Sequence, residues 1–118
     1  MSKIRELFFY KDYFKDFYKN QVYKVQKKIL WTFRVIEQLD RIPDIYLKHI
    51  ESTDGLYEIR VQSGSDIFRI FCFFDQNNII VVGHGFQKKT NKTPHIEIER
   101  ALNIKNKYYE EKQKSHKP

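Results

Sequence analysis

Two arginines flank a sequence that is typical of a hairpin turn. Arg60 precedes and Arg69 follows Ser63-Gly64-Ser65-Asp66, and glycine with short polar residues favours a tight turn between antiparallel strands. A two-residue turn, or a four-residue loop of the same register, would place Arg60 directly opposite Arg69. Like charges in that position destabilise a sheet unless an anion lies between them. Because the guanidinium fork contacts phosphate oxygens in pairs, the arginines predict a phosphate site; Glu58 is the alternative, internal anion.

A histidine follows on the next expected strand. Two turns are possible before this strand. A turn centred on Gln76-Asn77 pairs Arg69 with His84, and a turn centred on Asn77-Asn78 pairs Arg69 with Phe86. The second is slightly favoured, because asparagine tolerates positive φ. Both registers put His84 on the arginine face, where an imidazole with an ordinary pKa of about 6.5 can transfer protons. A structural histidine near a strand end is the alternative. Glycines on both sides of it indicate a bulge or a close backbone approach: Gly83 and Gly85.

Basic residues continue from this strand into the loop that follows it. Lys88, Lys89 and Lys92 alternate with polar residues such as Thr90, a composition that suits contact with a nucleic-acid backbone. Lys48, which comes just before the expected sheet, extends this predicted RNA-binding rim.

No pattern typical of a metal or cofactor site is present. Cys72 is the only cysteine, and it falls on an expected apolar strand face, so we predict no disulfide and no nucleophilic role for it. The histidines lack the spacing of metal ligands; they are His49, His84, His95 and His116. We therefore predict that the protein uses neither a metal nor a cofactor.

The composition favours an anionic partner. The 118 residues carry a formal net charge of +7, with a pI of about 9.4. Such a protein suits nucleic acid, an anionic membrane or an acidic protein partner; a solvated basic face is the alternative. No apolar run is long enough for a transmembrane helix, and the first residues do not resemble a signal peptide. We expect a single cytoplasmic domain over residues 1–118.

Hydrophobic spacing predicts an α+β fold. We expect a short strand at residues 7–10 and a helical part over 11–40, broken near Asn20, with apolar residues three and four positions apart. From Leu56 the spacing changes to two, which predicts three antiparallel strands; they cover 56–62, 67–75 and 79–86. A last helix is predicted with Thr93 as its cap and Pro94 as its first residue, followed by a flexible basic tail from about residue 112.

The strand pattern also separates two sheet faces. One face is apolar and is the expected core side; it carries Ile59, Val61, Phe68, Ile70, Cys72 and Phe74. The other carries Glu58, Arg60, Gln62, Ile67, Arg69 and Phe71. The aromatic residues of the helical part are also expected in the core; they are Phe14, Phe17, Tyr18 and Trp31.

Several segments together resemble a known family. They are 56–60 (Leu-Tyr-Glu-Ile-Arg), 68–71 (Phe-Arg-Ile-Phe), 84–90 (His-Gly-Phe-Gln-Lys-Lys-Thr), 92–94 (Lys-Thr-Pro) and 97–98 (Glu-Ile). The chain resembles the HigB-type branch of the RelE/ParE toxin superfamily, a branch that includes phage-derived proteins. The resemblance covers essentially the whole chain and is most specific between Gly85 and Pro94.

This resemblance implies a RelE-like, microbial-RNase-type fold, in which helices pack on one sheet face and the other, basic face holds the active site. It implies the toxin of a type II toxin–antitoxin system, which cleaves translated mRNA on the ribosome without a metal. The expected partners are the ribosome, mRNA and a cognate antitoxin of helix-turn-helix type, through which alone promoter DNA is bound; no membrane is involved.

The implied reaction is attack of an RNA 2′-hydroxyl on the adjacent phosphate. Arg60 and Arg69 would stabilise the charge that develops on phosphorus, and His84 would act as general acid or base. Lys88 and Lys89 would hold the backbone or help a proton to move. The basic loop and rim would contact RNA, through Lys48, Thr90 and Lys92. Glu58 is an alternative base, or it orients Arg60.

Two other functions stay open. Relatives of ParE type share the fold but inhibit DNA gyrase without cleaving RNA, so the fold alone does not decide the target. A phage or mobile-element protein that only binds nucleic acid is the third interpretation. It predicts binding without cleavage products.

Overall fold

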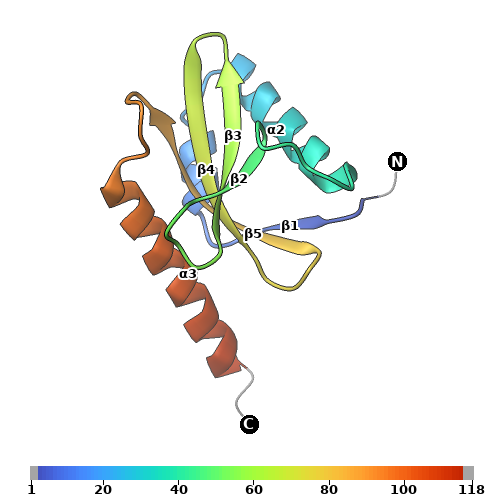
Figure 1. Cartoon of the computed structure of the whole chain (residues 1–118), viewed down its shortest axis with the longest axis vertical. Helices are drawn as coiled ribbons and strands as arrows, with labels where there is room; N and C mark the ends of the chain where they lie inside the picture. Colours follow the sequence, from blue (N-terminus) through green and yellow to red (C-terminus); the bar gives the residue numbers. More distant parts are fainter. Residues whose placement is uncertain (1–2, 116–118) are drawn as a thin grey trace.

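A single mixed sheet forms the centre of the structure (Figure 1). The computed structural model describes residues 3–115. Its strands are β1 (Glu6–Phe9), β2 (Leu47–His49), β3 (Leu56–Ser63), β4 (Asp66–Phe74) and β5 (Ile79–Lys88). Its helices are α1 (Tyr13–Tyr18), α2 (Tyr23–Gln38) and α3 (His95–Ser115). The predicted α+β composition and the break between the first two helices are confirmed.

The sheet has five strands, in the order β1-β5-β4-β3-β2, so the prediction of a three-stranded sheet was wrong. β1 lies parallel to β5, a pairing between distant segments that local spacing does not reveal. β2 pairs antiparallel with β3 over three residues, which is too short for an alternating pattern to be visible. These two additions widen the face on which Arg60 and Arg69 lie.

The β3–β4 hairpin has the predicted register. Ser63 pairs with Asp66 and Arg60 pairs with Arg69. Gly64 has a φ of 61°, a left-handed value that glycine adopts without a steric penalty. The turn residues therefore place the two arginines opposite each other.

The β4–β5 hairpin contains a bulge. Arg69 pairs with Phe86 and Ile70 with Gly85, but Cys72 pairs with Val82, so two residues of β5 stand opposite Phe71. The favoured register is confirmed beside Arg69, and the irregularity lies at Gly83 and His84, as the glycines indicated. A β-bulge of this kind re-aims the side chains next to it.

Of the two glycines in β5, Gly85 has the closer neighbour. A Cβ atom at residue 85 would lie 2.7 Å from the ring of Phe17, whereas one at Gly83 would have its nearest contacts at 3.6 Å. Gly85→Ala should therefore lower the free energy of unfolding by about 1–3 kcal/mol, while Gly83→Ala should cost less than about 1 kcal/mol. Urea denaturation of the two variants measures this difference, and equal losses would contradict the close approach.

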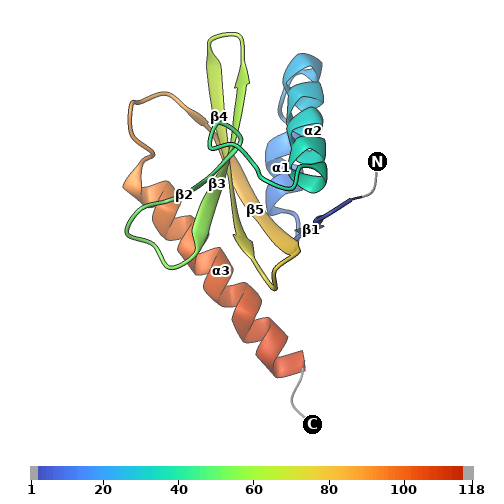
Figure 2. The ribbon, with the colours of Figure 1, turned by 45° about the vertical axis from the view of Figure 1, so that its right-hand side comes forward.

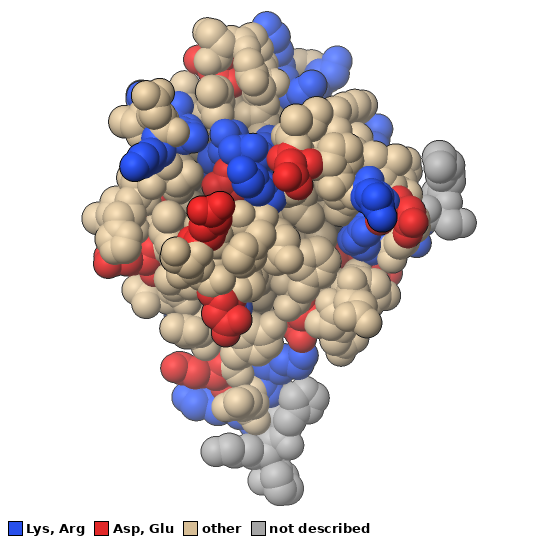
Figure 3. Space-filling view, viewed as in Figure 1, with Lys and Arg blue, Asp and Glu red and all other residues tan. Residues whose placement is uncertain are grey.

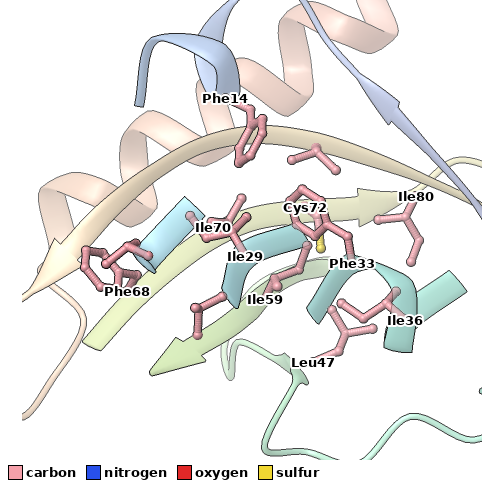
Figure 4. Packing of buried hydrophobic residues seen from close by; sticks show 13 residues of the cluster. Phe14, Ile29, Phe33, Ile36, Leu47, Ile59, Phe68, Ile70, Cys72 and Ile80 are labelled. Atoms are coloured by element: carbon pink, nitrogen blue, oxygen red, sulfur yellow. The ribbon is translucent and has the colours of Figure 1, made fainter. Parts of the chain in front are cut away.

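The apolar face of the sheet packs against α1 and α2 (Figure 4). Phe14, Ile29, Phe33 and Ile36 from the helices contact strand residues such as Ile70. The predicted core face is confirmed. Burial raises the pKa of the Cys72 thiol, as expected for a thiol without access to solvent.

Trp31 departs from the predicted core. Phe14 is buried and Phe17 and Tyr18 are partly buried against it, but the side chain of Trp31 is 44% exposed. The prediction that Trp31 lies in the core was wrong. Trp31 lies on the side of α2 next to the tip of the β3–β4 hairpin and not on the side that packs against the apolar sheet face.

The third helix packs on the opposite sheet face, and Figure 2 shows the sheet between α1 and α2 on one side and α3 on the other. Ala101 contacts the cluster that contains Phe71, and Ile104 contacts Phe73 and Val81. The expectation that the helices pack on one face only was therefore wrong. The helix covers the part of this face near the β4–β5 turn and leaves the part near the β3–β4 turn open.

Both ends of α3 differ from the prediction. The backbone amide of Ile98 donates to the carbonyl of Pro94, so Pro94 precedes the helix and Thr93 is not its cap. At the other end the helix continues to Ser115, so the described part of the expected tail, 112–115, is helical; residues 116–118 lie outside the described range.

Asp75 holds the C-terminal part of α3, because it accepts hydrogen bonds from Tyr108 (2.5 Å) and Lys112 (2.6 Å). Although burial alone would raise its pKa, these bonds lower it overall.

Within residues 3–115, no helix combines the length and apolar character needed to cross a membrane.

Candidate phosphate site on the open part of the sheet

One carboxylate lies between the two paired arginines. Glu58 Oε2 is 3.0 Å from Arg60 Nε and 2.8 Å from Arg69 Nε. The Glu58 side chain is only 8% exposed, so its charge is held in place by these two cations. The internal anion considered from the sequence is therefore present, but a single carboxylate oxygen serves both guanidiniums.

Both arginines border a surface hollow. Arg69 is the less accessible of the two: its Nε is buried in the ion pair with Glu58, without a hydrogen-bond acceptor of good geometry among the described residues, and its Nη1 donates to the carbonyl of Phe68 (3.2 Å). Arg60 is more open, with 28% of its side chain exposed. Both arginines line a hollow of about 190 Å³ together with Ile45, Val61, Gln62 and Ile67. A group with several acceptor oxygens, such as a phosphate, suits donors arranged in this way.

Two lysines extend the arginine pair into a diagonal row. Lys48 on β2 pairs with Glu58, and Lys88 on β5 pairs with Ile67. Lys48, Arg60, Arg69 and Lys88 thus lie on one face of four neighbouring strands; the two arginines are directly opposite each other, and each lysine is offset by two residues, Lys48 in one direction along the sheet and Lys88 in the other. We call these four residues the cation diagonal. A row of this kind matches successive phosphates of a nucleic-acid backbone better than it matches a single small anion.

The local charge of the site is positive. Glu58 supplies one negative charge against the four cations of the diagonal. Burial lowers the pKa of Arg69, and Glu58 partly opposes this. Burial also lowers the pKa of Lys88, and the charges of Arg69 and Arg60 add to the effect. Figure 3 shows Lys and Arg atoms over the part of this face that the β3–β4 hairpin forms.

His84 does not line this hollow. It is 2% exposed, its ring lies 4.9 Å from that of Phe71, and its Nε2 is 3.2 Å from Glu97 Oε1 on α3. Burial and the charge of Arg100 lower its pKa, against the effect of Glu97. The sequence placed His84 on the correct face but did not reveal that α3 covers it. Its role as general acid or base stays a prediction, and the geometry is that of the structural alternative.

The lowered pKa of His84 predicts how stability depends on pH. The unfolded chain, with an ordinary histidine pKa of about 6.5, takes up a proton before the folded protein does. The free energy of unfolding should therefore fall as the pH decreases through about 6.5, until the folded-state pKa is reached. Urea denaturation between about pH 5 and 7.5 tests this; His84→Gln should flatten the dependence, and an unchanged slope in that variant would contradict it.

The loop after β5 is exposed and borders the site. Lys89, Thr90 and Lys92 are all exposed, and the Thr90 hydroxyl donates to the carbonyl of Lys92. The structure therefore places these three predicted contacts outside the hollow, next to Lys88 in the chain. Their RNA-binding roles stay predictions.

Two residues of the site were missed from the sequence. Thr93 Oγ1 lies 3.4 Å from Glu58 Oε1, so the residue taken for a helix cap instead helps to hold the shared carboxylate. Gln62, beside Arg60 on the same strand, lines the hollow. Gln62 follows Arg60 by two residues, and this spacing in a strand already indicated that both side chains lie on the same face.

No group of three or more histidine, cysteine, aspartate and glutamate side chains within residues 3–115 is arranged to hold a metal ion. His116, one of the four histidines considered for such a site, lies outside that range.

Comparison with known proteins identifies a family. The model of the family described as "Phage derived protein Gp49-like (DUF891)" matches residues 12–106. Comparison with curated proteins gives no significant match. The matched family is a RelE/ParE-like toxin family, so the resemblance found in the sequence is confirmed at this broader level. Because the match spans most of the chain, from α1 into α3, this protein belongs to the family of phage-derived Gp49-like proteins.

Proposed function

We propose that this protein is the toxin of a type II toxin–antitoxin system and acts as a ribosome-dependent endoribonuclease of HigB type. The observation that carries the proposal is the Arg60–Arg69 pair on a single buried carboxylate, open to a surface hollow. Two guanidiniums in that position are suited to the negative charge that develops when a phosphodiester is attacked. The cation diagonal supplies further contacts for the RNA backbone on either side.

The proposed reaction needs only the substrate and protein side chains. The 2′-oxygen of one nucleotide forms a bond to the adjacent phosphorus, and the bond from phosphorus to the 5′-oxygen of the next nucleotide breaks. The 2′-hydroxyl proton passes to a base, and the departing 5′-oxygen receives a proton. The products are a 2′,3′-cyclic phosphate and a free 5′-hydroxyl.

Within this proposal, Lys88 is the side chain best suited to move a proton. It flanks the arginines, and its pKa is lowered by burial and by their charges, which brings a lysine closer to the range where it exchanges protons efficiently. Glu58 is a positioning residue, because both of its oxygens are held by protein groups. His84 contacts α3 and does not line the hollow, so it is the second candidate for proton transfer.

The proposed partners follow from this activity. They are the ribosome and its mRNA in the cytoplasm, and a cognate antitoxin of helix-turn-helix type, through which alone promoter DNA would be bound. Lys48, Lys89, Thr90 and Lys92 are proposed to contact mRNA or ribosomal RNA. The exposure of these residues, the pairing of Lys48 with Glu58 and the place of the other three directly after Lys88 in the chain support this assignment.

The chemistry of the new RNA ends tests the proposal. A reporter mRNA is translated in a cell-free reaction with the protein, and the fragments are treated with polynucleotide kinase without prior phosphatase. We expect direct labelling of the downstream fragments, because their 5′ ends carry a hydroxyl. Fragments with 5′-phosphates would contradict the mechanism. Intact mRNA at protein concentrations that stop growth would favour a gyrase inhibitor.

A further inference from the structure

A second hollow lies between α2 and the tip of the β3–β4 hairpin. It has a volume of about 550 Å³ and is lined by Tyr23, Lys24, Lys27, Lys28 and Trp31 from the helix, and by Gln62, Ser63 and Gly64 from the hairpin. We call it the α2 groove. None of the functions described above uses its helix residues.

The α2 groove presents aromatic rings and lysines together. Tyr23 is 73% and Trp31 is 44% exposed, although large aromatic side chains are usually buried where a core is available. Lys28 Nζ lies 4.6 Å from the Trp31 ring centroid, and Lys27 Nζ lies 5.4 Å from that of Tyr23. A flexible lysine thus lies over each ring, and such a lysine can move to a phosphate and leave its place over the ring to a base.

The groove continues to the phosphate site around the edge of the sheet. Gln62 lines both the α2 groove and the hollow that contains Arg60 and Arg69. Tyr46 also joins them: its carbonyl accepts a hydrogen bond from the Arg60 amide, and its ring lies 5.6 Å from that of Trp31. Gln62 and Tyr46 thus connect the hollow at Arg60 and Arg69 with Trp31.

We propose that the α2 groove binds a single-stranded RNA segment that flanks the phosphate to be cleaved. Bases stack on Trp31 and Tyr23, and Lys24, Lys27 and Lys28 contact the backbone. Aromatic platforms with neighbouring lysines bind single strands in a way that tolerates any sequence. This inference rests on the proposed function for its substrate class and extends it to a second subsite.

The observations favour RNA over an acidic peptide. Lysines alone would serve either ligand, since both carry negative charge. Exposed ring faces add binding energy chiefly for ligands with flat aromatic groups, and a nucleotide has one at every step along the chain. The α2 groove also adjoins the hollow at Arg60 and Arg69 through Gln62, and a ligand with phosphates suits both places.

Trp31 is the only tryptophan of the chain, so intrinsic fluorescence reports on the groove directly. Titration with a single-stranded oligouridylate of about 12 nucleotides should quench this fluorescence in a saturable manner and more strongly than a duplex RNA of equal length. Because the proposed cleavage needs the ribosome, binding of free RNA can be followed without cleavage. RNA binding that is seen by anisotropy of a labelled oligonucleotide but leaves the fluorescence unchanged would overturn the proposal. A response to oligoglutamate but not to RNA would overturn it in favour of a peptide.

Variants separate stacking from charge. Trp31→Ala should weaken RNA binding roughly five- to hundredfold, while Trp31→Tyr, which keeps an aromatic face, should retain most of the affinity. The double variant Lys24→Ala/Lys27→Ala should reduce the dependence of log Kd on log salt by about 0.7 per lysine. Lys107→Ala/Lys114→Ala removes the same charge from exposed positions on α3 and is the matched control. Equal losses in the two double variants would overturn the proposal, as would equal affinities of Trp31→Ala and the natural protein.

These measurements are independent of the catalytic assay. RNA binding at Trp31 without ribosome-dependent cleavage would support the groove and contradict the proposed function. Cleavage without any involvement of Trp31, Lys24 or Lys27 would do the reverse.

Discussion

Arg69→Ala should lower the rate of ribosome-dependent mRNA cleavage by about 10²–10³-fold. This is the usual effect of removing one fixed donor that stabilises charge in a transition state. Arg69 is the more constrained of the two arginines, with 9% of its side chain exposed and its Nε 2.8 Å from Glu58. Single-turnover cleavage of a reporter mRNA on stalled ribosomes measures the effect.

The matched control is Arg34→Ala, which removes an exposed arginine from α2 and should leave the rate nearly unchanged. Arg69→Lys keeps the charge but loses the planar fork, so its rate should fall between the two. Glu58 keeps contacts to Arg60 and Thr93 in the alanine variant, and circular dichroism with urea denaturation checks that it folds. If Arg69→Ala folds and still cleaves at the natural rate, the active site does not lie on this face of the sheet.

Lys88→Arg should abolish most cleavage while RNA binding is retained. Arginine keeps the positive charge but does not release a proton in the accessible pH range, so loss of a general acid or base should cost about 10²–10⁴-fold. Lys88→Ala should lose binding as well as cleavage, because it also removes a charge from the cation diagonal. The pair of variants is compared by cleavage rate and by anisotropy of a labelled RNA.

The pH dependence of the rate distinguishes the two roles of Lys88. If Lys88 acts as the base, the rate of the natural protein rises with pH and levels off below the ordinary pKa of lysine, about 10.4, because burial and the arginines lower its pKa. Full activity of Lys88→Arg would show that the lysine serves only as a charge. His84 would then be tested next, despite its burial.

The arginine pair was predictable because its cause is local. The segment between Arg60 and Arg69 holds a turn with glycine at the position of positive φ, and the register of a short hairpin follows from its turn. The bulge in β5 was foreseen only as an irregularity. Its effect depends on Phe71 and α3, which are distant in sequence.

The environment of His84 could not be predicted, because the apolar residues of α3 predict an amphipathic helix but not the sheet face against which it packs. The contacts of Ala101 and Ile104 settle that choice, and they bury the histidine. Thr93 was misassigned for a similar reason. A threonine before a proline suits a helix cap, and only the tertiary contact with Glu58 shows its actual partner.

Trp31 shows the limit of helical spacing as a guide to burial. It neighbours Leu30 and Phe33 in an apolar run, but α2 turns only one side toward the sheet, and Trp31 remains on the groove side. The exposure of Trp31 depends on how α2 packs against the sheet, so the groove is visible only in the structure.

Primer extension on a reporter mRNA in a cell-free translation reaction tests the central claim most directly, with the natural protein beside Arg69→Ala and with ribosomes present or omitted. We predict discrete cuts within translated codons that require ribosomes and are lost in the variant. Uncut mRNA at protein concentrations that stop growth or translation would contradict a nuclease centred on Arg60 and Arg69.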